Sequence, residues 1–121
     1  MEHEGYSLRV VAHFDAPTHA GRIAEPQATG SAGSPSRGSS VRLYLRVDDN
    51  KVQAARFEAL GCPHTLAAAD VVCADIEGRA LADLADYDAG FLVEVLALPA
   101  EKLDIRILLE DAVRSAARQA N

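Results

Sequence analysis

Between positions 41 and 60 the sequence alternates apolar and polar residues more regularly than anywhere else. Apolar side chains occupy alternate positions of Val41–Val47, the period of a strand that buries one face. Residues 48–51 read Asp-Asp-Asn-Lys, and turn-forming residues of this kind favour a reversal of the chain. Residues 52–60 alternate more loosely. We therefore expect an antiparallel hairpin made of 41–47 and 52–60.

This hairpin leads directly into the most regular helix of the chain. Gly61 permits a tight turn, and Pro63 suits the first helical position, where its missing N–H is no loss. Apolar residues then recur at helical spacing as far as Ile76, and Gly78 suits the C-terminal cap. Cys62 therefore lies at the start of a helix, whose partial positive charge favours the thiolate, the form that binds metal or attacks sulfur.

The second cysteine and two histidines need no special chemistry. Cys73 falls on the apolar stripe of the same helix, where a thiol behaves as a small hydrophobe. Cys62 and Cys73 are separated by roughly 16 Å of helix, which is beyond the reach of a disulfide. His13 and His19 have no partner nearby in the sequence and make no spaced metal pair, so we expect a surface or packing role for both.

Most of the remaining sequence has helical periodicity. A first helix with apolar residues from Tyr6, including Leu8, ends near Asp15. Asp88 is placed to cap a short helix that ends before Pro99, and a last helix is expected from about Glu101 to Gln119.

One stretch, Gln27–Ser40, shows no periodicity and is rich in Gly and Ser around Pro35. This composition predicts a mobile loop. A phosphate-binding loop is not predicted, because no lysine follows the glycines and a strand comes next.

Together these elements predict a single α+β domain over residues 1–121. We expect a small antiparallel sheet of about three strands, covered on one face by four to five helices.

Charge and hydropathy restrict the class of partner. The formal net charge is −6 and the basic residues are scattered, which argues against nucleic acid. No apolar run approaches the roughly 20 residues that span a bilayer, and the N-terminus lacks the layout of a signal peptide. We expect a cytoplasmic protein with no membrane contact.

Several short motifs, in this order and at this spacing, resemble one known family. They are Tyr6-Ser7 with His13-Phe14 and Pro17, the run 33–39, Val47-Asp48, Ala55-Arg56-Phe57, Gly61-Cys62, Gly78-Arg79, Leu96–Pro99 and Glu110-Asp111-Ala112. The chain resembles the NifU-like, or IscU-type, scaffold proteins on which iron–sulfur clusters are assembled. The resemblance implies the SufE/NifU (IscU)-like fold, and the iron–sulfur assembly machinery as partners.

The resemblance also implies where the site lies. The family uses three cysteines, with an aspartate two residues after the first and a histidine just before the third. Cys62 matches the second cysteine, whereas Arg37 stands at the first and Ser39 at the aspartate position. Asp104 stands at the histidine position and Ile105 at the third cysteine. The chain is thus identified as a diverged member that lacks two of the three cluster cysteines.

These replacements decide what we expect of the site. An iron–sulfur cluster needs about four ligands, so normal scaffold action is not expected. We predict that Arg37 and Asp104 form an ion pair where the family uses a metal. Cys62 is expected either to carry one sulfur, with a cysteine desulfurase as partner, or to be an inert thiol.

Two alternatives stay open. One is a mononuclear zinc or iron site made by Cys62, Asp104 and possibly His64, because zinc accepts sulfur, oxygen and nitrogen ligands. The other is a metal-free interaction or regulatory protein. An enzyme is not expected, since Cys62 and His64 are not spaced as a nucleophile with its base and an orienting group.

Overall fold

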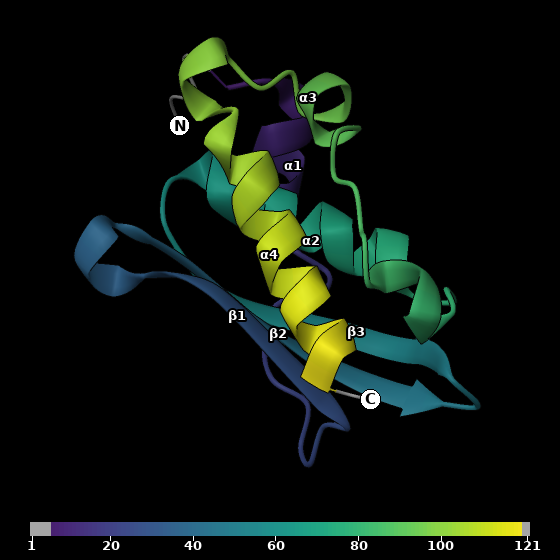
Figure 1. Cartoon of the computed structure of the whole chain (residues 1–121). Helices are drawn as coiled ribbons and strands as arrows, with labels where there is room; N and C mark the ends of the chain where they lie inside the picture. Colours follow the sequence, from purple (N-terminus) through teal and green to yellow (C-terminus); the bar gives the residue numbers. More distant parts are fainter. Residues whose placement is uncertain (1–5, 120–121) are drawn as a thin grey trace.

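The computed structural model describes residues 6–119 (Figure 1). Three antiparallel strands, β1 (Ala28–Ser34), β2 (Ser39–Asp48) and β3 (Lys51–Leu60), pair in the order β1-β2-β3. Figure 1 shows the helices gathered on one face of this sheet, which confirms the α+β architecture. The helices are α1 (Leu8–Asp15), α2 (Pro63–Ile76), α3 (Leu92–Val95) and α4 (Asp104–Gln119), with single 3-10 turns at Pro35–Arg37, Leu81–Leu84 and Ala100–Lys102.

The predicted hairpin is confirmed. Leu43 lies opposite Phe57 and Leu45 opposite Ala55, and all four side chains are buried beneath the helices. The register shifts once, between Arg46 and Val47. Since side chains alternate between the two faces of a strand, the local pattern was sufficient to place this core.

The predicted loop at Gln27–Ser40 is wrong, because most of it forms β1 and a 3-10 turn. The glycine at position 30 explains the difference. A Cβ there would lie 2.1 Å from the carbonyl oxygen of Ala112 and 2.5 Å from the amide nitrogen of Ala116. Gly and Ser therefore serve here as small residues that let α4 approach the strand backbone.

Two helix extents and the burial of one side chain also differ from the predictions. The last helix begins at Asp104 rather than Glu101, because a separate 3-10 turn precedes it. The helix after Asp88 is a single turn, and Asp88 does not cap it. The Asp88 carboxylate instead accepts a hydrogen bond from the N–H of Gly90 and forms an ion pair with Arg106. Leu8 was expected on the apolar stripe but is 88% exposed.

Helix α2 is the centre of the helical layer. It packs against β3 on one side and against α1 on the other, so that buried residues occupy most of the helix circumference. Cys73 is fully buried, as predicted, and both cysteines are free. Within residues 6–119 the structure contains no helix with the length and hydropathy that crossing a membrane requires.

Candidate functional site around Cys62

The backbone holds Cys62 at the N-cap of α2. Its own dihedrals are extended, with φ −76° and ψ 171°, and the helix begins at Pro63 as predicted. Gly61 has φ +154°, and a Cβ there would lie 2.8 Å from the hydroxyl of Thr65. Both the dihedral and the space therefore require glycine before the cysteine.

Cys62 opens into a pocket of about 190 Å³ between the start of β2, the start of α2 and the start of α4. Four of the five positions singled out in the sequence line it together, namely Ser39, Cys62, Asp104 and Ile105. The other lining residues are Gly38, Thr65, Glu101 and Lys102. The tertiary structure thus brings one thiol, one ammonium and two carboxylates to the same hollow.

The surroundings of Cys62 favour its thiolate. Burial alone would raise the pKa of this thiol, but the backbone N–H groups of Thr65 and His64, the Thr65 hydroxyl and the Lys102 ammonium outweigh it, so the pKa lies below its ordinary value. The Thr65 hydroxyl oxygen lies 3.7 Å from Sγ. Cys62 is only partly buried, so its thiolate is open to a reaction partner.

The predicted ion pair between Arg37 and Asp104 is not formed. Both residues line a neighbouring hollow of about 300 Å³, but no ion pair within 4.0 Å joins them in residues 6–119. Arg37 is exposed in the 3-10 turn at the tip of the β1–β2 hairpin. An exposed pair gains only about 0–1 kcal/mol, too little to hold a long arginine side chain across the hollow.

Few candidate cluster ligands face Cys62 in the described part of the chain. Cluster ligation takes about four thiolate or comparable ligands. Across the described part of the chain, no group of three or more His, Cys, Asp and Glu side chains is placed to hold a metal ion. Cys62 and Asp104 are the two candidates that face the same pocket.

His64, the third candidate ligand, lies apart from this pocket. Its side chain is buried, with 4% of the residue exposed, and its ring centroid lies 4.8 Å from that of Tyr6. Its Nδ1 has no hydrogen-bond partner among the described residues. Burial lowers the pKa of His64, Lys102 lowers it further, and Glu101 partly opposes them.

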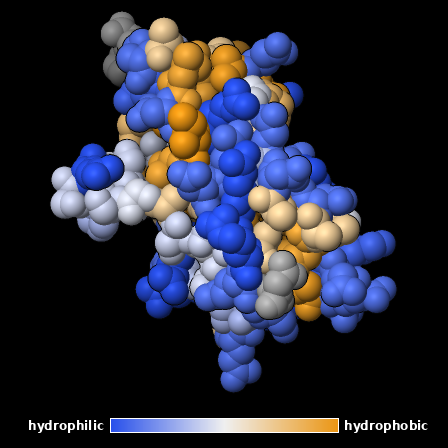
Figure 2. Space-filling model, viewed as in Figure 1, coloured by the Kyte–Doolittle hydropathy of each residue, from blue (hydrophilic) through white to orange (hydrophobic). Residues whose placement is uncertain are grey.

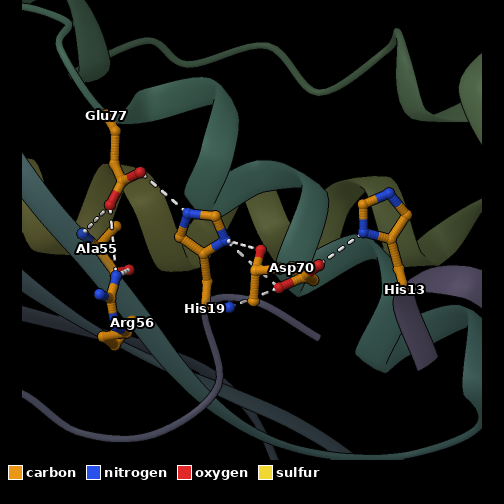
Figure 3. A network of polar contacts seen from close by, with 7 residues as sticks. His13, His19, Ala55, Arg56, Asp70 and Glu77 are labelled. Carbon is orange, nitrogen blue, oxygen red and sulfur yellow. Dashed lines mark hydrogen bonds and ion pairs between the residues drawn. The ribbon is translucent and has the colours of Figure 1, made fainter. Parts of the chain in front are cut away.

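A second polar cluster, centred on Asp70, was missed from the sequence (Figure 3). Asp70 is 1% exposed in the middle of α2. Its Oδ2 accepts from His13 Nδ1 at 2.6 Å, and its Oδ1 accepts from the backbone N–H of His19 at 2.9 Å. The two histidines therefore have a shared partner, in the packing role that was expected of them.

The cluster continues along the edge of β3. His19 Nε2 donates to Glu77 Oε1 at 2.9 Å, and Glu77 Oε2 accepts from the N–H of Ala55 at 2.9 Å and from Arg56 at 3.4 Å. One local signal could have found it: Asp70 interrupts an otherwise apolar run from Leu66 to Cys73. A carboxylate on the buried face of a helix needs partners.

Comparison with known families agrees with the fold. A model of the NifU-like N-terminal domain matches residues 5–120. The chain belongs to this family.

Curated relatives of this NifU-like chain are iron–sulfur assembly proteins. The mitochondrial iron sulfur cluster assembly protein 1 of Yarrowia lipolytica is 32% identical over 125 aligned positions, which cover all of this chain and 69% of the relative. The iron–sulfur cluster assembly scaffold protein IscU of Haemophilus influenzae is 30% identical, with 92% of this chain and 91% of the relative covered. The family is therefore one of iron–sulfur assembly scaffolds, as the sequence predicted.

Solved structures share the fold of this NifU-like chain. A protein assigned as the iron–sulfur cluster assembly scaffold for the SUF system of Fervidobacterium islandicum superposes with a TM-score of 0.76 at 18% identity, covering 93% of this chain and 96% of that one. A nitrogen-fixing NifU-like protein (N-terminal) from Brucella abortus gives 0.72 at 23% identity, with 94% and 92% covered.

Proposed function

We propose that this chain takes part in iron–sulfur cluster assembly as an acceptor of single sulfur atoms on Cys62, with a cysteine desulfurase as donor. The observation that carries the proposal is the position of Cys62. Cys62 is the N-cap residue of α2, its thiol faces an open pocket with Lys102, and the pKa of this thiol is lowered. The donor set argues against the other role, that of holding a cluster.

The transfer needs no metal and no change of overall oxidation state. The Cys62 thiolate attacks the terminal sulfur of the donor's cysteine persulfide. The donor's sulfur–sulfur bond breaks, its cysteine leaves as a thiolate, and Cys62 becomes a persulfide. The N–H groups at the start of α2 and the Lys102 ammonium stabilise the anion before and after the transfer. In this proposal the chain is a carrier and has no catalytic activity of its own.

Mass spectrometry after incubation with a cysteine desulfurase and cysteine tests the proposal. We expect a gain of one sulfur atom per chain that maps to Cys62 and disappears on reduction. Cys62→Ser is the matched variant, because serine is a good N-cap residue and keeps the helix start.

Cys73 provides an internal control. Burial raises the pKa of its thiol far above the ordinary value, so it should remain unmodified in the same sample. Sulfur found on Cys73 but not on Cys62, or on neither cysteine while the desulfurase turns over, would refute the carrier role.

A metal-free interaction protein is the second candidate, and the surface of α4 favours it. Ile107 on α4 is 58% exposed, Leu103 just before the helix is 43% exposed, and Figure 2 shows hydrophobic residues gathered over the start of the helix. A mononuclear zinc or iron site fits less well, because Cys62 and Asp104 supply two of the four donors that a structural zinc site takes. Elemental analysis of the purified protein separates the two: one zinc or iron per chain that Cys62→Ser and Asp104→Asn each remove would favour the metal site.

A further inference from the structure

The two edges of the sheet differ, and the β3 edge is covered by other segments from Val52 to Phe57. The N–H of Phe57 donates to the carbonyl of His19 at 2.9 Å, and its carbonyl accepts from Gly21 at 2.8 Å. The N–H of Ala55 donates to the Glu77 carboxylate at 2.9 Å, and that of Val52 to the carbonyl of Arg79 at 3.0 Å. No strand could add to this edge without displacing these partners.

The β1 edge is open beyond Thr29. The N–H of Thr29 donates to the side chain of Gln119, so this N–H points away from β2, toward the outer edge of the sheet. Because hydrogen-bonding direction alternates along an antiparallel strand, the N–H groups of Ser31 and Gly33 point outward as well. Within residues 6–119 neither has a hydrogen-bond partner on that side. The outward positions carry no charge and no proline, the usual protections of a free edge.

Helix α4 turns this edge into a groove. It crosses β1 at Gly30, and its Leu108 lies beside Gly33. The hollow at the end of the edge is lined by Gly33, Leu108 and Asp111 among others, and Ile107 beside them is 58% exposed. Figure 2 shows hydrophobic atoms between α4 and the pale end of the β1–β2 hairpin. A strand lying here would have backbone partners on β1 and side-chain partners on α4.

We propose that this groove binds an extended segment of a partner protein, which adds to the sheet beside β1. The segment turns an apolar side chain toward Leu108 and a basic one toward Asp111. The net charge of −6 favours a basic partner over an acidic one. The mode is strand addition, in which backbone hydrogen bonds give affinity and alternate side chains give specificity.

A second copy of this chain is a poorer occupant. Two β1 strands paired edge to edge would be about 4.8 Å apart, whereas packed helices need about 8–10 Å between their axes. Because α4 lies directly over β1 at Gly30, the two α4 helices would collide near the two-fold axis. A lone strand brings no such helix.

The inference is independent of Cys62 chemistry, and peptide titration followed by amide NMR on the full chain tests it. The probe is the acetylated and amidated peptide Thr-Val-Thr-Lys-Thr-Val, which turns Val and Lys to the same face. We expect shift changes at Ser31, Gly33 and Leu108 and slower hydrogen exchange at the Ser31 amide. A probe N-methylated at alternate residues should bind at least about tenfold more weakly, because it cannot complete the edge hydrogen bonds.

Matched variants locate the contact. Ser31→Pro removes an N–H that points outward from the sheet and should abolish binding. Ser31→Thr keeps this N–H and should still bind. Asp111→Asn should reduce the preference for the Lys probe over one with Glu in its place. Equal binding of the N-methylated probe, shift changes confined to other surfaces, no shift at millimolar peptide, or a wild-type dimer that Ser31→Pro dissociates would each overturn the proposal.

Discussion

Polar side chains in the middle of α2 and at its start differ in how they are paired. In the middle, Asp70 is 1% exposed and each of its oxygens has a partner. At the start, the Thr65 hydroxyl oxygen lies 3.7 Å from Cys62 Sγ, and the neighbouring His64 Nδ1 is unpaired among the described residues. One helix therefore combines a fully paired buried carboxylate with an N-terminal end whose thiol faces an open pocket.

The difference has a physical reason. A buried polar group stabilises a fold only when it is paired, because its lost hydration must be replaced. Asp70 and Glu77 tie α1, the segment around His19 and β3 to one rigid helix. The Cys62 thiol instead faces a pocket, and its lowered pKa increases the fraction of reactive thiolate. The following predictions test this division, from the largest expected effect to the smallest.

Asp70→Ala should be the most damaging change. It leaves the His13 ring N–H and the His19 backbone N–H without their acceptor. We expect the free energy of unfolding, measured in urea, to fall by about 3 kcal/mol. The rate of Cys62 alkylation in the folded protein should stay unchanged. The control is Asp83→Ala at an exposed position, where we expect less than about 0.5 kcal/mol. Equal stability of the two variants would break the comparison.

Glu77→Gln should destabilise less, by about 1 kcal/mol, because the amide keeps one acceptor oxygen while two donors, His19 and Ala55, need one each. Urea unfolding measures it, with the exposed Glu94→Gln as control. If Glu77→Gln lost as much unfolding free energy as Asp70→Ala, the main stabilising contacts would lie at the end of α2 and not in its middle.

His64→Leu should change how stability depends on pH, by less than the effect of Glu77→Gln. Because burial lowers the pKa of His64 in the folded chain, the unfolded chain binds a proton more readily, and stability is lost as the pH falls below about 6.5. The variant should therefore gain stability relative to the wild type between pH 7 and pH 5. Parallel pH curves of unfolding free energy for the two proteins would contradict this.

Lys102→Gln should have the smallest effect. Removing the ammonium raises the pKa of Cys62 and so lowers the thiolate fraction below that pKa. We expect iodoacetamide alkylation at neutral pH to slow about twofold, with a smaller difference at high salt. Lys51→Gln on β3 is the matched control and should not change the rate. An unchanged rate in Lys102→Gln would leave the helix start alone responsible for the low pKa.

Much of the fold could be predicted because its signals are local. The alternation in 41–60 and the Gly61-Cys62-Pro63 turn placed two strands and the start of α2 correctly. The strand at Ala28–Ser34 could not be found this way, since Gly and Ser carry no strand signal of their own. Its conformation depends on pairing with β2 and on α4 packing against Gly30.

The candidate site was foreseen in part. Resemblance to the family named Ser39, Cys62, Asp104 and Ile105, which line one pocket. The ion pair assigned to Arg37 was wrong, because opposite charges at neighbouring positions do not fix the geometry of an exposed arginine. Asp70 was missed, since its partners His13 and His19 lie 57 and 51 positions away in the sequence.

By itself the sequence determined the family, the hairpin, the α2 start and the thiol that lies there, because periodicity, turn chemistry and motif order are properties of neighbouring residues. Only the tertiary structure decided that β1 is a strand with an open edge, that Asp70 is a paired anchor, and that Cys62 shares its pocket with Lys102 and Asp104. Those outcomes depend on which distant segments pack together, and packing is decided by the whole chain at once.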